Sequence, residues 1–229
     1  MTDGGNMRDL TIVFDLDGTL VDTAPDLVHA TNHVLRGLGF TEVAPELLRP
    51  WISYGAKRMI IEGLAYSGQE ATEAELERLL ESFLEYYARN IAYESRPFPG
   101  AVAALDRFLS HGVRLAVCTN KREVLSLSLL DQLDLTRRFA AITGRDTFPV
   151  SKPHPDHLRG AIRQAGGDLA RAVMVGDSEV DIATAKAAHV PVVGVTFGYT
   201  QVPVERLAPD AVIDHYDQLE ATVAALMAC

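Results

Sequence analysis

The chain has few of the features that mark membrane, secreted or metal-finger proteins. It holds two cysteines, Cys118 and Cys229, without the spacing of metal ligands. No window contains the roughly 18 apolar residues of a membrane-spanning helix. The N-terminal segment MTDGGNMRDL is polar and lacks the apolar centre of a signal peptide. Because free thiols are typical of the cytoplasm, we expect a cytoplasmic protein that does not bind a membrane.

Positive charge is also scarce. Lys and Arg together number 21 against 31 Asp and Glu, which gives a formal net charge of −10. A nucleic-acid binder needs a basic face, so this class is not expected. The seven histidines form no metal-spaced cluster. With 229 residues and 48% hydrophobic composition, the chain can bury the core of one large domain or of two unequal ones.

Short apolar runs alternate with helical patterns along most of the chain. Near-continuous apolar strands separated by helices are typical of a parallel sheet covered on both faces, so we predict a doubly wound, Rossmann-like α/β fold. The predicted strands are Leu10–Phe14, Val113–Cys118, Ala140–Thr143, Ala172–Val175, Val192–Val195 and Ala211–Ile213, and the predicted helices are Val102–His111, Glu123–Leu133, Pro155–Ala165 and Val180–His189.

The segment 22–95 interrupts this alternation with helical patterns alone. Ala24–Leu38 forms one helical pattern, and Thr72-x-x-Glu75 is a capping box that opens another. A segment of about seventy residues is too long for an ordinary loop. We therefore predict a small helical cap domain at 22–95, inserted into an α/β core made of 1–21 and 96–229. The stretch ESRPFPG (94–100) is the expected return hinge.

Polar residues follow several of the predicted strands. In TIVFDLDGTLVDT (11–23) the first strand ends on Asp15 and Asp17. Thr119 follows a second strand, Lys152 stands in SKPHP before a helix, and Asp177 follows a third strand. In parallel α/β sheets ligands bind at the carboxyl ends of the strands. These groups converge if the sheet places their strands side by side.

A cluster of these groups could hold a metal ion and a phosphate. Neighbouring carboxylates raise each other's pKa, and a divalent cation that prefers oxygen ligands, most simply Mg²⁺, removes the conflict. Lys152 and Thr119 can then hold a phosphate, together with backbone N–H groups around Gly18. One ionised carboxylate can attack phosphorus and form an aspartyl-phosphate. A second can protonate the leaving oxygen and later accept a proton from water.

The motifs DLDGT, CTN, SKPHP and GDSEVD, in this order, resemble the four motifs of the haloacid dehalogenase superfamily of phosphohydrolases. The resemblance covers nearly the whole chain, including the inserted cap. It implies that Asp15 is the nucleophile and a magnesium ligand. It implies that Asp17 is the general acid/base and binds magnesium through its backbone carbonyl, and that Asp177 completes the metal site. Thr119 and Lys152 would bind the transferring phosphoryl group.

Further residues border this site. Asn120, beside Thr119, belongs to the expected phosphate site. Asp181 is expected to support the metal site, through water or by orienting Lys152; alternatively it serves only the positive end of a helix dipole. Asp22 is expected to be a loop or hinge acid rather than a ligand.

The substrate follows from finer similarities. Dehalogenases do not need an acid two residues after the nucleophile, so Asp17 favours phosphoryl transfer. PVVGVTFGY (191–199) and PDAVIDHYDQL (209–219) are similar to segments of bacterial phosphoglycolate phosphatases. We therefore expect a small phosphate monoester, above all 2-phosphoglycolate. Its carboxylate needs further donors, for which Lys57, Arg58 and Lys121 are candidates; a solvated helix face is the alternative for Lys57 and Arg58.

Other functions share these motifs. A phosphomutase of the β-phosphoglucomutase kind would carry every core motif, and the substrate could be a sugar phosphate or pyrophosphate. A phosphonatase would use a cap lysine, such as Lys57, to form a Schiff base. A response-regulator receiver is excluded by the chain length, the inserted helices and a nucleophile on the first strand. We expect a monomer or a homodimer.

Overall fold

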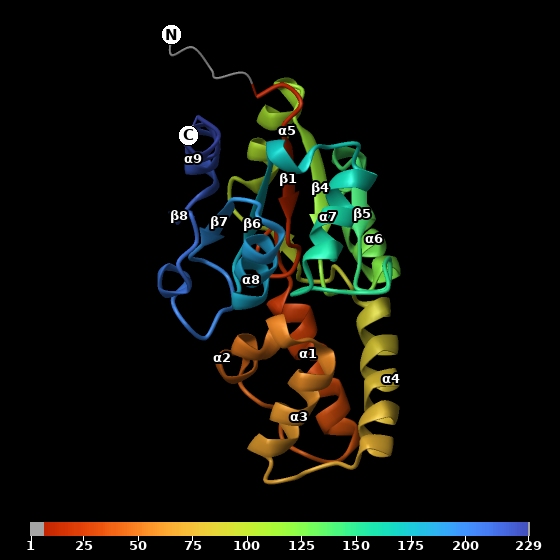
Figure 1. Cartoon of the computed structure of the whole chain (residues 1–229). Helices are drawn as coiled ribbons and strands as arrows, with labels where there is room; N and C mark the ends of the chain where they lie inside the picture. Colours follow the sequence, from red (N-terminus) through yellow and green to blue (C-terminus); the bar gives the residue numbers. More distant parts are fainter. Residues whose placement is uncertain (1–6, 229) are drawn as a thin grey trace.

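The computed structural model describes residues 7–228, which form a six-stranded parallel sheet covered by helices (Figure 1). The strand order is β5-β4-β1-β6-β7-β8, with β1 paired to β4 on one side and to β6 on the other. All six predicted strands are present, and the predicted α/β fold is confirmed. Their bounds are β1 Thr11–Phe14, β4 Arg114–Cys118, β5 Ala141–Thr143, β6 Ala172–Gly176, β7 Val192–Val195 and β8 Ala211–Ile213.

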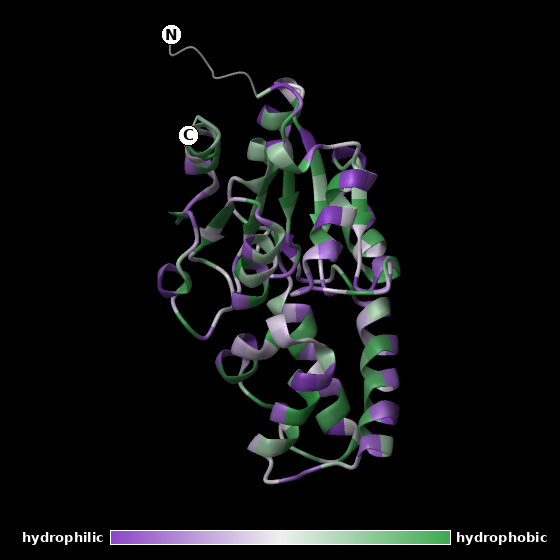
Figure 2. Cartoon of the chain, viewed as in Figure 1, coloured by the Kyte–Doolittle hydropathy of each residue, from purple (hydrophilic) through white to green (hydrophobic). Residues whose placement is uncertain are grey.

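Alternate residues of the strands face two separate layers of helices. Ile12 and Phe14 belong to a core that includes residues of α5 and α9, whereas Val13 belongs to a core formed with α7 and α8. Figure 2 shows apolar strands between helices that carry both polar and apolar residues. The helices are α5 Ala101–Ser110, α6 Glu123–Gln132, α7 Pro155–Gln164, α8 Glu179–Ala188 and α9 Leu219–Leu226, with short 3₁₀ turns at Thr136–Arg138, Leu169–Arg171, Val204–Leu207 and Tyr216–Gln218.

Four helices lie together beyond the carboxyl ends of the strands (Figure 1). We call 24–89 the helical segment; it contains α1 Ala24–Gly37, α2 Pro45–Leu48, the 3₁₀ turn Arg49–Tyr54, α3 Ala56–Tyr66 and α4 Glu73–Arg89. The predicted capping box is present, since the Glu75 carboxylate accepts the backbone N–H of Thr72 at 2.8 Å and Thr72 Oγ1 accepts that of Glu75 at 3.4 Å. The division into a cap and a core domain stays a prediction.

Two short strands, which the sequence did not predict, frame the helical segment. β2 (Val21–Asp22) pairs antiparallel with β3 (Arg96–Pro97), so the outgoing and returning chains run side by side. Strands of two residues are too short for a periodic pattern, which explains why they were missed. β3 falls within the expected return hinge.

A buried carboxylate ties the helical segment to the returning chain. Asp26, in the first turn of α1, is 1% exposed. It accepts hydrogen bonds from the backbone N–H of Ser95 at 2.8 Å, from the Ser95 hydroxyl at 2.6 Å and from the backbone N–H of Glu94 at 3.0 Å. The start of α1 is thereby fixed to the chain that leads into β3.

Across residues 7–228, no helix has both the length and the apolar character needed to cross a bilayer. Cys118 lies buried at the end of β4 as a free thiol. Cys229 lies outside the described residues.

We expect Asp26→Ala to lower the free energy of unfolding by about 1–3 kcal/mol, because it leaves the N–H groups of Glu94 and Ser95 without their acceptor. Urea unfolding of the variant and the wild type measures the difference. Glu81→Ala, an exposed change within α4, is the control and should alter stability little. Equal stability of Asp26→Ala and the wild type would contradict the anchoring role of Asp26.

Candidate active site

The strand order brings the predicted site residues to one edge of the sheet. Asp15 follows β1, Thr119 follows β4 and Asp177 follows β6, and β1 lies between the other two strands. All three residues are buried; Asp15 is 8% exposed, Thr119 2% and Asp177 0%. The strands that carry these residues are therefore neighbours, as the convergence of their side chains requires.

Three buried carboxylates surround one buried ammonium group. Oxygens of Asp15, Asp177 and Asp181 lie within 4.8 Å of one another. Lys152 Nζ is 2.7 Å from Asp15 Oδ1 and 2.6 Å from Asp181 Oδ1. Three acids against one lysine leave negative charge uncompensated, and a hard divalent cation with oxygen ligands fits this donor set.

The pKa values of these groups follow from their burial and from the excess of carboxylates over ammonium groups. Burial raises the pKa of Asp15 to about 7, with Asp181 adding to the rise and Lys152 opposing it. Burial likewise raises the pKa of Asp177 to about 8, again with a contribution from Asp181. Burial alone would lower the pKa of Lys152, but the carboxylates of Asp15 and Asp181 outweigh it and raise that pKa. Lys152 thus stays charged, while Asp15 and Asp177 hold protons more tightly than usual.

Two glycines let the loops approach Asp177. The carboxylate of Asp177 accepts the Thr19 hydroxyl at 3.0 Å and the backbone N–H of Tyr199 at 2.8 Å. Gly18 has φ +86°, and a Cβ there would lie 2.6 Å from Asp177 Oδ2. A Cβ at Gly198 would lie 2.1 Å from Asp177 Cβ. A side chain at either position would displace the acid, so the sequence needs glycine at both.

Asp181 contacts both the start of a helix and Lys152. It closes a capping box at the start of α8, where its Oδ2 accepts the Ser178 backbone N–H at 3.1 Å and the Ser178 hydroxyl at 2.6 Å. Its Oδ1 accepts Lys152 Nζ. In the cluster that could hold a cation, Asp181 stands beside Asp15 and Asp177, whereas the side chain of Asp17 does not belong to it. The metal contact expected for Asp17 is through its backbone carbonyl.

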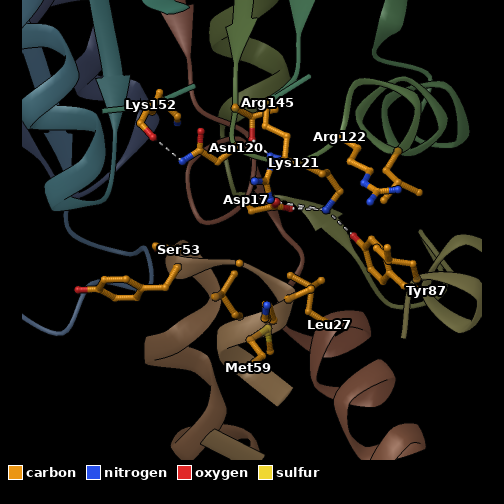
Figure 3. Close-up of a pocket in the computed structure, with 18 of the residues that line it drawn as sticks. Asp17, Leu27, Ser53, Met59, Tyr87, Asn120, Lys121, Arg122, Arg145 and Lys152 are labelled. Atoms are coloured by element: carbon orange, nitrogen blue, oxygen red, sulfur yellow. Dashed lines mark hydrogen bonds and ion pairs between the residues drawn. The ribbon is translucent and has the colours of Figure 1, made fainter. Parts of the chain in front are cut away.

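The Asp17 carboxylate is directed toward a second lysine (Figure 3). Asp17 Oδ1 accepts the Thr23 hydroxyl at 2.7 Å, and Lys121 Nζ lies 2.9 and 3.1 Å from the two oxygens. Lys121 Nζ also donates to the hydroxyl of Tyr87, on α4, at 2.7 Å. Burial alone would lower the pKa of Lys121, but the neighbouring Asp17 carboxylate outweighs it and raises the pKa.

The polar residues expected at the phosphate site lie around the same edge. Asn120 donates from Nδ2 to the backbone carbonyl of Lys152 at 3.0 Å, which joins the β4 loop to the SKPHP loop (Figure 3). Thr119 Oγ1 accepts the backbone N–H of Lys121 at 3.2 Å. Thr119, Asn120 and Lys152 line one cavity together with Asp15 and Asp17.

This cavity has a volume of about 620 Å³ and is bounded on its other side by the helical segment. Leu27, Met59 and Tyr87 contribute apolar surface from three helices (Figure 3). The site is therefore a pocket between the sheet edge and the helical segment, with polar groups on the sheet side. Its location matches the ligand sites of open parallel sheets.

The two candidate residues of the helical segment differ in position. Lys57 lines the cavity and forms an ion pair with Glu73. Arg58 does not line the cavity; its guanidinium lies 4.6 Å from the centre of the Trp51 ring and pairs with Glu62. Of these two residues, only Lys57 therefore lies beside the candidate catalytic residues.

Arg122 and Arg145 line the cavity but were not predicted as site residues. Arg122 follows Lys121, and Arg145 lies two residues beyond the end of β5. The Arg145 backbone N–H donates to the Lys121 carbonyl at 2.9 Å, so the loops after β4 and β5 are joined. A search for charged residues after every strand, including β5, would have found Arg145.

Comparison with known proteins identifies the family. A family model described as haloacid dehalogenase-like hydrolase matches residues 12–195. The chain belongs to this family, and it is a phosphoric monoester hydrolase.

The chain is similar to named relatives and to a solved structure along most of its length. The chain is 51% identical over 213 residues to the phosphoglycolate phosphatase of Mesorhizobium japonicum, covering 93% of this chain and 94% of the relative. It is 48% identical over 207 residues to that of Agrobacterium fabrum, covering 90% and 89%. Among solved structures, a predicted phosphoglycolate phosphatase from Haemophilus somnus superposes with a TM-score of 0.88 at 29% identity, covering 96% of this chain and 99% of that one.

We expect the metal-free protein to lose stability as the pH rises from about 4 to about 8 through Asp15 and Asp177. Both folded-state pKa values, about 7 and about 8, lie above the value of about 3.9 for an unfolded aspartate, so the folded state binds more protons in this window. A cation bound by these carboxylates competes with the protons. Mg²⁺ should therefore raise the melting temperature more at about pH 8 than at about pH 5.5.

Thermal unfolding with and without magnesium chloride at both pH values measures this effect, with sodium chloride of matched ionic strength as the control. Asp177→Asn should lose most of the magnesium effect at the higher pH. The same stabilisation at both pH values would contradict metal binding at these acids.

Proposed function

We propose that the chain is a magnesium-dependent phosphatase that hydrolyses a small phosphate monoester, above all 2-phosphoglycolate, through an aspartyl-phosphate at Asp15. The observation that carries the proposal is the cavity in which Asp15, held against Lys152, lies beside Asp17, Thr119 and Asn120. The names of the relatives support the substrate, since two of them, 51% and 48% identical to this chain, are phosphoglycolate phosphatases.

The proposed reaction has two steps. An Asp15 carboxylate oxygen attacks phosphorus, the bond from phosphorus to the ester oxygen breaks, and Asp17 gives that oxygen a proton. Asp17 then takes a proton from a water molecule, whose oxygen attacks the phosphorus of the aspartyl-phosphate and frees Asp15 and inorganic phosphate. Lys152 and Thr119 hold the phosphoryl oxygens. When bound by Asp15, Asp177 and the Asp17 carbonyl, Mg²⁺ would offset the negative charge that accumulates there.

The carboxylate of 2-phosphoglycolate needs a partner outside the phosphate site. Lys57 meets this need better than Arg58, because it lines the cavity whereas Arg58 is engaged by Trp51 and Glu62. A small carboxylate near the helical segment would compete with Glu73 for the Lys57 ammonium group. The expected cytoplasmic location, and a monomeric or homodimeric state, stay predictions.

The function is tested by phosphate release from a set of small esters in the presence of magnesium. We expect 2-phosphoglycolate to have the highest kcat/KM among 2-phosphoglycolate, glucose phosphates and pyrophosphate, with phosphonoacetaldehyde as a test for phosphonatase activity. A hexose phosphate with a much higher kcat/KM would overturn the substrate while leaving the family membership intact.

Lys57→Ala and Arg58→Ala form a matched pair for substrate choice. Lys57→Ala should weaken the binding of 2-phosphoglycolate, measured as a higher KM, by about 1.5–3 kcal/mol, the value of a charge-assisted hydrogen bond. The same substitution should change KM for an aryl phosphate little. Arg58→Ala should change neither by a comparable amount. If both variants affect both substrates equally, Lys57 has no part in recognising the carboxylate.

Asp17→Asn separates the two chemical steps. An aryl phosphate leaves as a stabilised phenolate and needs little protonation, so Asp15 should still become phosphorylated. The second step lacks its base, and turnover should fall about 10²–10⁴-fold. Covalent phosphate should accumulate on the peptide that contains Asp15, detectable by mass, whereas 2-phosphoglycolate should give much less. Asp15→Asn should give none, and wild-type turnover by Asp17→Asn would exclude Asp17 as the acid/base.

A further inference from the structure

Lys121 is shared between the sheet edge and the helical segment. It lies in the loop after β4, and its ammonium group reaches Asp17 on one side and the hydroxyl of Tyr87, on α4, on the other (Figure 3). The Lys121 side chain is 5% exposed, and Tyr87 is 1% exposed. The ammonium group also lies 4.5 Å from the centre of the Tyr87 ring, within the range of a cation–π contact.

This arrangement restricts Lys121. A lysine ammonium has three N–H donors, and here they face two oxygens of Asp17 and one of Tyr87. The aromatic ring of Tyr87 packs beside it. A flexible side chain is thereby held in one place, so Lys121 can position its neighbour as well as balance charge.

The arrangement also restricts Asp17. Its Oδ1 accepts both Thr23 and Lys121, and its Oδ2 accepts Lys121. Thr23 comes from the chain just ahead of α1, whereas Lys121 comes from a different strand end. Contacts to both oxygens, from two directions, fix the plane of a carboxylate that could otherwise rotate about its last torsion.

We propose that Lys121, held by Tyr87, is a positioning residue that sets the orientation of the Asp17 carboxylate for proton transfer. The inference rests on the proposed role of Asp17 as the acid/base group. Since Tyr87 belongs to α4, the helical segment contributes to the chemical step through this contact and not only by covering the cavity. Proton transfer depends steeply on geometry, and a misplacement of about 1 Å can cost about 10²-fold in rate.

A double-mutant cycle tests this proposal, with Lys121→Met and Asp17→Asn singly and combined, and phosphate release from 2-phosphoglycolate as the assay. Lys121→Met alone should lower kcat about 10²-fold with little change in KM. In the Asp17→Asn background the same substitution should change kcat by no more than about twofold, because the group it positions is already lost.

A different role for Lys121 gives a different result. If its ammonium group binds an anionic group of the substrate, Lys121→Met should raise KM in both backgrounds. Independent, additive effects of the two substitutions would equally overturn the proposal.

Tyr87→Phe provides a second test in which the ring and its packing are retained. Loss of one hydrogen bond, worth about 0.5–1.5 kcal/mol, should lower kcat about 2–10-fold, and this effect should also disappear in the Asp17→Asn background. Tyr86→Phe is the matched control, since Tyr86 is the neighbouring residue on α4. Its ring stacks on that of His33, with 4.2 Å between the ring centres. Thermal unfolding of each variant shows whether it folds.

If Lys121→Met does not fold, Tyr87→Phe in the two backgrounds decides the question alone; an unchanged kcat, or a loss that persists without Asp17, overturns the proposal. The failure of the proposed function is distinguishable from these outcomes. If Asp17→Asn retains wild-type turnover, the role of Asp17 fails whatever Lys121 does. If the wild type does not hydrolyse 2-phosphoglycolate, the cycle is carried out with an aryl phosphate, because the proposal concerns the orientation of Asp17 and not the choice of ester.

Discussion

The interaction on which the rest of the site depends is the contact of one buried ammonium group, Lys152, with the carboxylates of Asp15 and Asp181. Burying a charge is costly unless it is paired and hydrogen-bonded. Here three acids, including Asp177, share one lysine, so the pairing is incomplete. The site is stable enough to form but still favours a further positive charge.

The local backbone also holds the buried acids in place. The capping box at Ser178 fixes Asp181 at the start of α8 while leaving one of its oxygens for Lys152. Gly18 and Gly198 give the space in which Asp177 lies beneath two loops. The helix terminus and the close loops are therefore arranged around the buried acids. Preorganised charges of this kind are what catalysis of phosphoryl transfer requires, because little reorganisation is then needed during the reaction.

The same edge of the sheet also controls how the helical segment is attached. Tyr199, whose backbone N–H donates to Asp177, donates from its hydroxyl to Asp22 at 2.5 Å and accepts the backbone N–H of Ala24 at 3.0 Å. One residue thus links the acid cluster to β2 and to the start of α1. Together with the contacts of Asp26 to the returning chain, Tyr199 fixes the start of the helical segment beside the candidate site.

The sequence by itself determined the six strands of the main sheet and most of the candidate site residues, but not β2, β3 or Arg145. Apolar runs predicted all six strands of the sheet, the capping box at Thr72 predicted the start of α4, and the motifs named Asp15 and Lys152, because these signals are local and periodic. The tertiary structure alone decided the strand order that makes β4, β1 and β6 neighbours. It also decided the contact of Lys121 with Tyr87 and the position of Lys57, but not Arg58, in the cavity. Such contacts form when packing brings together residues that are far apart in the chain, so local sequence patterns do not predict them.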